Sequence, residues 1–288
     1  MHLFLPLTSS VLVVMGLLCI QRAQKAGVST WTTLILVCWS SACVFPALTL
    51  LGGEMQPAAM LWQPAIIGLL FLAGQLFTFF AVARGDVSVA APVLGVKVLI
   101  VPAASSIVVG EAVAPRVWIA AAIAVLGVGF VQARDATVER SLILASVGYA
   151  LLAACSMTLF DLLIQRWAPA WGAGYFLPIA FAFTAVFSLV FLPLADRPAD
   201  LNGKGVTPFL AWGGLLMAIQ AIGMTVTLGL FGDATRVNIV YSLRGLWGVV
   251  LTWLLARSTG TAVASNRTMA LRLIGAGLIG VAVVISVT

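Results

Sequence analysis

Ten apolar segments, each long enough to cross a bilayer as a helix, follow one another along the chain. Crossing the hydrocarbon core of a membrane takes about 20 predominantly apolar residues in a helix. Backbone groups in lipid must be hydrogen-bonded within the protein, and a helix bonds its own. The sequence therefore predicts an all-α polytopic membrane protein with ten transmembrane helices, which we place near 4–22, 31–51, 64–84, 87–109, 117–133, 141–163, 173–195, 208–231, 234–256 and 269–287.

The composition leaves no room for a soluble domain. Of the 288 residues, 62% are hydrophobic and 8% are charged, against about 25% charged residues in an average soluble domain. Only Met1 and His2 precede the first segment, which lacks the basic region and cleavage site of a signal peptide, so we expect it to remain as a span. We expect a multi-pass protein embedded in the lipid bilayer of a bacterial inner membrane.

Several classes of chemistry find no support in the sequence. The four cysteines lie within predicted spans and form no Cys-x-x-Cys spacing, so we expect neither disulfides nor a metal site. The net charge of +6 comes from basic residues scattered between spans, which is typical of orientation signals and does not indicate nucleic-acid binding. The only histidine is His2, and no His-Glu-x-x-His, Gly-x-Ser-x-Gly or P-loop motif is present. We therefore expect no enzymatic activity and no cofactor.

The chain divides into two halves with the same plan. Four charged residues fall within Arg134–Arg140, which we interpret as a linker (134–140) between repeats at 1–133 and 141–288. Ile-Gln-Arg recurs 144 residues apart, at 20 and 164, and Gly-Asp recurs 147 residues apart, at 85 and 232. At that second offset Lys97 aligns with Arg244. Because each repeat has an odd number of spans, the second enters the membrane from the opposite side, which predicts inverted five-helix repeats with a site near the midplane.

Residues 79–131 contain a small-residue and Gly-Asp turn, an apolar helix that ends in Gly110-Glu111, a short link, and a glycine-rich helix through Gly127 and Gly129. In these features the segment resembles the third to fifth helices of an EamA-type repeat of the drug/metabolite transporter (DMT) superfamily. Helix number, repeat plan and length extend the resemblance to nearly the whole chain. The resemblance implies a ten-helix transporter that works by alternating access around a central cavity.

Two features depart from the pattern of that family. Where relatives carry a proline twelve residues before the Gly-Glu pair, this chain has Val98, and Gly245 stands at the corresponding place in the second half. Arg257-Ser258 stands where the second Gly-Glu pair would be. Lys97 and Arg244 immediately precede the missing prolines, which indicates that the centre of this member is altered.

Lys97 and Arg244 are the deepest charges in the predicted spans, and each allows two interpretations. Arg244 could anchor a substrate, because its planar fork holds a carboxylate or phosphate bidentately; it could instead be a structural cation packed by Tyr241 and Trp247, three residues to either side. Lys97 could hold the anion or switch coupling by losing its proton, and otherwise would snorkel or pair with a carboxylate. Our hypothesis is that the two cations are unpaired and form the floor of a central anion site.

Three further polar residues fall within predicted spans. Asp161, which we place near the end of the sixth span, could accept a proton for coupling, although a helix-end ion pair beside Gln165 and Arg166 is the alternative. Gln75 and Gln220 lie on helices that line the cavity in relatives. These two amides could bind a polar substrate or tie helices together.

A secondary active transporter, an exporter or exchanger, fits these features best, with proton coupling or substrate exchange as its driving mechanism. Deep positive charges favour a small-molecule solute that bears a carboxylate or phosphate, amino acids included, and disfavour cations. The alternative within the superfamily is a multidrug exporter of lipophilic cations. A channel or membrane scaffold is the alternative of another class, although it does not explain cations at matching repeat positions. The sequence is compatible with a monomer and with a homodimer.

The orientation signals conflict. Outside Lys97 and Arg244, the connections after even-numbered spans carry three basic residues, Arg116, Arg166 and Arg236. Those after odd-numbered spans carry ten, namely Arg22, Lys25, Arg84, Arg134, Arg140, Arg197, Lys204, Arg257, Arg267 and Arg272. The positive-inside rule then places both termini outside the cytoplasm, whereas relatives are expected to keep both inside. We favour the charge count.

Overall fold

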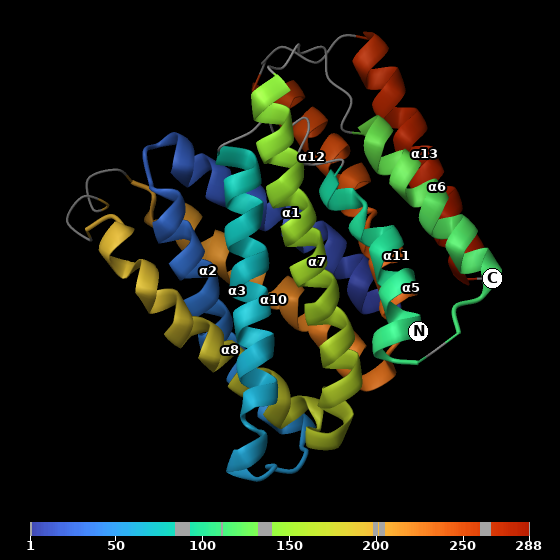
Figure 1. The fold of residues 1–288 in the computed structure, drawn as a ribbon. Helices are drawn as coiled ribbons and strands as arrows, with labels where there is room; N and C mark the ends of the chain where they lie inside the picture. Colours follow the sequence, from blue (N-terminus) through green and yellow to red (C-terminus); the bar gives the residue numbers. More distant parts are fainter. Residues whose placement is uncertain are drawn as a thin grey trace. The chain divides into compact units, whose positions relative to one another are not determined.

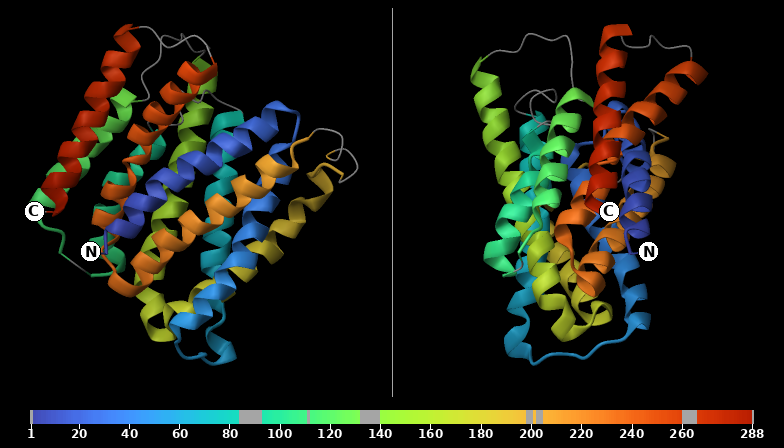
Figure 2. Two further views of the ribbon diagram at one scale, coloured as in Figure 1. Left: turned by 180° about the vertical axis from the view of Figure 1, so that it is seen from behind. Right: turned by 90° about the vertical axis from the view of Figure 1, so that its right-hand side faces the viewer.

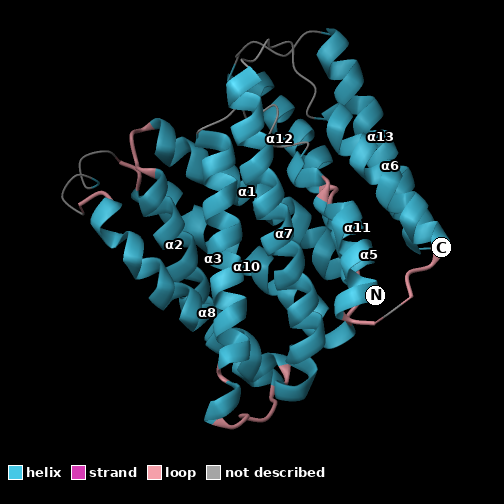
Figure 3. Cartoon of the chain, viewed as in Figure 1, coloured by secondary structure: helices cyan, strands magenta, loops and turns pink. Residues whose placement is uncertain are grey.

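The computed structural model describes residues 2–83, 93–110, 112–131, 140–197, 201, 205–259 and 266–287. Every regular element in these ranges is a helix (Figure 1, Figure 3). The α-helices are α1 (Phe4–Lys25), α2 (Thr30–Val44), α3 (Trp62–Ala83), α5 (Lys97–Val108), α6 (Pro115–Val131), α7 (Arg140–Trp171), α8 (Ala173–Ser188), α10 (Thr207–Phe231), α11 (Ala234–Tyr241), α12 (Arg244–Thr259) and α13 (Asn266–Val287). Short 3-10 helices are η1 (Phe45–Leu51), η2 (Ala58–Met60) and η3 (Leu189–Leu194).

Seven helical stretches within the described residues are long and apolar enough to cross a membrane. They match predicted spans one to three, six to eight and ten, and lie at Phe4–Lys25, Thr30–Leu51, Ala58–Ala81, Val147–Trp171, Ala173–Leu194, Thr207–Phe231 and Thr268–Val287. Their surfaces expose large apolar side chains such as Leu50 and Val190, which suits contact with lipid. The prediction of an all-α polytopic membrane protein is confirmed at this level.

Within the described residues, the helices at the other three predicted spans are shorter or interrupted. The fourth contains an apolar helical stretch at Val93–Val108, and the fifth contains the 17-residue α6. The ninth is interrupted at Ser242 and Leu243, between α11 and α12. The Ser242 hydroxyl donates to the carbonyl of Ile239 at 2.6 Å, and such local side-chain bonds compete with continuation of a helix.

Two features of the repeat prediction lie outside the described residues. These are the Gly-Asp turn at 85–86 and residues 134–139 of the linker.

The helices group into two compact units. Unit 1 comprises Phe77–Leu162 and Asp233–Thr288, and unit 2 comprises His2–Leu76 and Leu163–Gly232. The divisions fall within α3 and α7. Each unit therefore combines segments from both predicted repeats.

In unit 1, α6 and α13 lie side by side (Figure 1, Figure 2). A Cβ added at Gly127 would lie 2.8 Å from the carbonyl oxygen of Gly275, and a Cβ at Gly275 would lie 2.5 Å from that of Gly127. Gly127 also lies against Ile279, and Gly275 lies against Val131. The helices are therefore antiparallel and touch backbone to backbone, the close approach that small residues permit between membrane helices.

In unit 2, α1 packs against α10, and α2 packs against α8; Figure 2 shows the first pair running together. The Phe45 ring at the start of η1 stacks on Phe181 of α8, with ring centroids 3.7 Å apart. Phe71 of α3 meets the same ring edge-on at 5.0 Å. Aromatic packing of this kind contributes beyond the area it buries, so these rings form part of the core of unit 2.

Two contacts at the ends of α2 and α8 are reciprocal. After η1, the chain returns to the start of α8, where a Cβ at Gly174 would lie 2.5 Å from the carbonyl oxygen of Gly52. After η3, the chain returns to the start of α2, where Asp196 Oδ2 accepts hydrogen bonds from the backbone N–H of Ser29 at 2.6 Å and the hydroxyl of Thr32 at 2.8 Å. Each helix therefore begins against the segment that follows the other.

Candidate functional site

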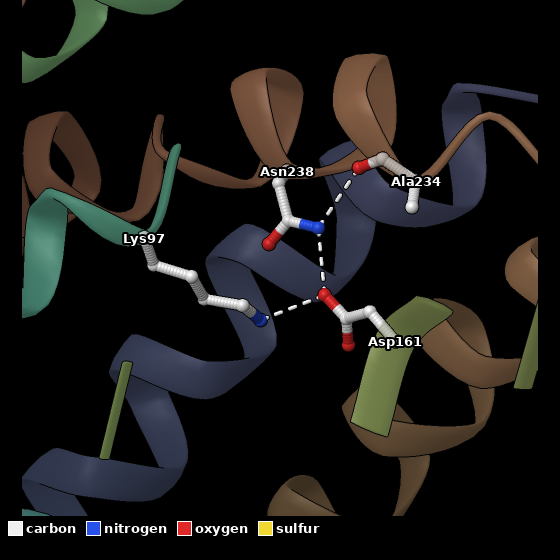
Figure 4. Close-up of polar contacts among 4 residues, drawn as sticks. All are labelled: Lys97, Asp161, Ala234 and Asn238. Atoms are coloured by element: carbon white, nitrogen blue, oxygen red, sulfur yellow. Dashed lines mark hydrogen bonds and ion pairs between the residues drawn. The ribbon is translucent and has the colours of Figure 1, made fainter. Parts of the chain in front are cut away.

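A buried polar cluster in unit 1 joins three helices through one carboxylate oxygen (Figure 4). Asp161 lies in the interior of α7 and is 3% exposed. Its Oδ2 accepts a hydrogen bond from Lys97 Nζ of α5 at 2.7 Å and another from Asn238 Nδ2 of α11 at 2.7 Å. Asn238 Nδ2 also donates to the backbone carbonyl of Ala234 at 2.9 Å. Helices α5, α7 and α11 therefore meet at Asp161.

The two charges of this cluster compensate each other. The side chains of Lys97 and Asp161 are 15% and 4% exposed, so water solvates neither charge well. Burying one ion alone would cost several kcal/mol, whereas an opposite charge and additional hydrogen bonds offset that cost. Asn238 supplies one such hydrogen bond. Lys97 and Asp161 therefore form a pair with no net charge.

The turn between α10 and α11 sets the position of Asn238. Asp233, directly before α11, has the left-handed helical conformation with φ of 58°, and Gly232 before it has a positive φ of 69° that glycine adopts without strain. The Asp233 carboxylate then accepts a hydrogen bond from the backbone N–H of Arg236 at 3.3 Å, which caps α11. Asn238 follows one turn after Ala234, the first residue of this short helix.

Lys97 and Arg244 each begin a helix directly after an interruption. A turn at Val96 precedes α5, whose first residue is Lys97, and the Ser242–Leu243 turn precedes α12, whose first residue is Arg244. A cation there faces the positive end of the helix dipole, whereas an anion would be favoured. For Lys97 the Asp161 carboxylate supplies the negative charge.

Arg244 has a different environment. Its side chain is exposed, and its Cζ lies 4.8 Å from the centroid of the Tyr241 ring at the end of α11. No carboxylate among the described residues forms an ion pair with it. Arg244 also lies near Lys97, and Asp161 lies near Tyr241. These residues therefore form one electrostatic cluster within unit 1.

Two expectations from the sequence need correction. The expectation of two unpaired cations is wrong, because Lys97 pairs with Asp161. The placement of Asp161 near a helix end is also wrong, because α7 continues ten residues further, to Trp171. The helix therefore extends beyond the predicted sixth span, which ends near residue 163, and Pro169 lies within its last turn.

The remaining candidates divide between the units. Tyr241 packs on Arg244, and Trp247 lies half-buried on α12. Gln75 of α3 and the buried Gln220 of α10 belong to unit 2. Of the seven candidate residues, the structure thus places five in unit 1 and two in unit 2.

Sequence reasoning missed two polar residues of unit 1. Asn238 is the only asparagine within a predicted span, and the argument that selects Gln75 would have selected it. Thr158 lies three residues before Asp161 on α7 and is 1% exposed. Its pattern gives no signal, because threonine in a membrane helix usually bonds its own backbone.

Comparisons with known proteins inform the fold alone. No protein-family model matches the chain, and no curated protein matches it. Among solved structures, 29 chains match. One, described only as the crystal structure of a protein, has 19% sequence identity and a TM-score of 0.69, with coverage of 99% of this chain and 98% of that chain. The likeness extends over the whole fold of both chains.

Proposed function

We propose that the chain is a secondary active transporter of a small polar solute that bears a carboxylate or phosphate, amino acids included. The observation that carries this proposal is the exposed residue Arg244 at the start of α12, which has no ion-pair partner among the described carboxylates. An intramembrane ionisable residue is a functional candidate by default. The solute's anionic group would be the missing counter-charge.

The two repeats support this interpretation by their difference. Lys97 and Arg244 align, but only Lys97 has a carboxylate partner. The Ile-Gln-Arg match at 20 and 164 aligns Asp161 with Leu17. Lys97 therefore has a compensating carboxylate, Asp161. At the position equivalent to Asp161 in the other repeat, the chain has the apolar residue Leu17, which cannot compensate Arg244.

The geometry of Arg244 suits a planar anion. The Tyr241 ring lies over the guanidinium, with 4.8 Å between Cζ and the ring centroid. The two side chains are also hydrogen-bonded to each other, and a guanidinium has five N–H donors in one plane. A carboxylate or phosphate could then accept two parallel hydrogen bonds, the strongest mode of anion recognition by arginine.

Reciprocal contacts support the further proposal of ten helices in two inverted repeats. In unit 1 the contact of Gly127 with Ile279 mirrors that of Gly275 with Val131, each pair of equivalents being 148 residues apart. In unit 2 the ends of α2 and α8 mirror each other in the same way. Together with the resemblance to EamA-type members of the DMT superfamily, this supports alternating access in a bacterial inner membrane and no enzymatic role.

The alternative functions differ in what they require of Asp161 and Arg244. An exporter of lipophilic cations would need a free intramembrane carboxylate, but the Asp161 carboxylate is held by Lys97 and Asn238. A cation would have to displace Lys97. A channel or scaffold would need no anchor at Arg244. Saturable counterflow in liposomes distinguishes a carrier from a channel and from a scaffold.

The proposal is tested on purified protein by ligand-induced thermal stabilisation, followed by counterflow in liposomes with the solutes that bind. The screen covers amino acids, organic acids, sugar phosphates and cationic dyes, because a ligand that binds the folded state raises its apparent stability. Arg244→Ala should abolish stabilisation and exchange while the protein stays folded. Arg244→Lys should weaken binding about 10- to 100-fold, since the bidentate geometry is lost.

Arg22→Ala is the matched control. Arg22 is also exposed and lies over an aromatic ring, with its Cζ 5.3 Å from the centroid of Phe209, but it sits in the last turn of α1. This variant should bind and exchange normally. Normal exchange by Arg244→Ala, or stabilisation by cationic dyes alone, would show that the substrate class is wrong.

A further inference from the structure

The cluster around Asp161 contains more oxygen atoms than its hydrogen bonds use. Asp161 Oδ2 accepts the hydrogen bonds from both Lys97 and Asn238 (Figure 4), which leaves Oδ1 without a partner among the described residues. Asn238 engages its neighbours through Nδ2, and its Oδ1 likewise has no partner in that part of the chain. The hydroxyl of Thr158 is buried one turn from Asp161, and it too lacks a partner there.

These oxygens are of the kinds that hold small, hard cations. Carboxylate, amide carbonyl and hydroxyl oxygens coordinate such ions in proteins. In transporters, sites for Na⁺ or protons lie at helix interruptions within the membrane. Asp161 is bonded to Lys97, which is the first residue of α5 and directly follows the interruption at Val96. Asn238 is bonded to the same Asp161 oxygen. Among the described residues, the only positive charge bonded to these groups is the Lys97 ammonium, 2.7 Å from Asp161.

We infer that Asp161, Asn238 and Thr158 form a cation site whose resident ion is the ammonium group of Lys97. A tethered cation cannot dissociate, so the native protein needs no free Na⁺ at this position. Removing the ammonium while keeping the carboxylate would leave a buried negative charge, and such a charge must be neutralised by a bound ion or by protonation. The role of the site in ion coupling rests on the proposed transport function, whereas the site itself does not.

The test measures thermal stability of the full-length Lys97→Met protein in detergent, without any solute. Melting temperatures are compared in NaCl, KCl and choline chloride at constant ionic strength, and from about pH 5.5 to 8.5. The native protein should respond equally to the three salts. Lys97→Met should be stabilised saturably by Na⁺ or K⁺ relative to choline if a metal cation enters, or by acid if Asp161 takes a proton.

The pH arm is interpretable because the other ionisable groups of the cluster are few. With Lys97 removed, those within the described part of the chain are Tyr241 of α11 and Arg244 of α12, whose residue types ordinarily titrate above this range. The double variant Lys97→Met, Asp161→Asn removes the Asp161 carboxylate from the cluster and should lose every cation response. Lys97→Arg keeps a tethered cation and should behave as the native protein does.

Thr158→Val in the Lys97→Met background tests the hydroxyl ligand and should raise the cation concentration needed for half-maximal stabilisation. If Lys97→Met does not fold, Lys97→Gln serves instead, because its amide can still donate to Asp161. Equal stability of the neutral Lys97 variants in all salts and at every pH would overturn the inference. That outcome would leave solute binding at Arg244 unaffected, so the two proposals fail separately.

Discussion

At the residue scale, one oxygen of Asp161 connects three helices. The sequence alone identifies Lys97 and Asp161 as ionisable residues in apolar segments, but it does not reveal that they pair. They are 64 residues apart and lie on different helices, so no helical spacing relates them. The pairing depends on how α5 packs beside α7, which is set by side chains elsewhere.

Asp161→Asn should destabilise the protein strongly, by about 3–5 kcal/mol, because it leaves the Lys97 ammonium buried without a counter-charge. Adding Lys97→Met to this variant should recover most of the loss. The measurement is the melting temperature of each purified variant in detergent. A matched control is Asp233→Asn, because Asp233 pairs with Arg236 at 3.1 Å with side chains 26% and 31% exposed, and asparagine caps a helix equally well. Equal losses at both positions would contradict the importance of burial.

At the element scale, the interruptions before α5 and α12 position the two cations. The sequence does not predict these interruptions, because the segments at 87–109 and 234–256 are continuously apolar, and hydropathy measures compatibility with lipid but does not detect a turn. Glycine patterns carry more information. Gly127 and Gly129 appear equivalent in the sequence, yet Gly127 touches the backbone of α13, whereas a Cβ at Gly129 would meet nothing within 4 Å.

Gly127→Ala should therefore destabilise unit 1 by about 1–3 kcal/mol, because the added methyl group forces α6 away from α13. Gly129→Ala should be neutral or slightly stabilising, since alanine favours a helix over glycine by up to about 1 kcal/mol. The two variants differ only in position, so their melting temperatures give a direct comparison. Similar values would argue against backbone contact between the helices.

At the scale of the whole molecule, the sequence predicts the class of protein better than its organisation. Apolar length suffices to place seven membrane-compatible helices close to where the structure has them. The two compact units could not be predicted, because each combines segments from both halves of the chain and the divisions fall within continuous helices. Orientation in the membrane depends on the flanking basic residues, and this property can be measured directly.

With ten basic residues after odd-numbered spans and three after even-numbered ones, the positive-inside rule predicts that Thr288 lies outside the cytoplasm. A reporter pair fused after Thr288 checks this prediction. Periplasmic phosphatase activity without cytoplasmic fluorescence is the expected result. The opposite result would mean that near-symmetric repeats are oriented by something other than total charge.

The compensation of Lys97 by Asp161 also has an electrical consequence. The pair contributes no net charge, whereas Arg244 contributes one positive charge, and moving one elementary charge through 100 mV takes about 2.3 kcal/mol. On the proposed function, a solute with one net negative charge would cancel that charge in the loaded carrier. The rate of exchange of one such solute for another would then not depend on membrane voltage. Only the return of the empty carrier would be voltage-dependent.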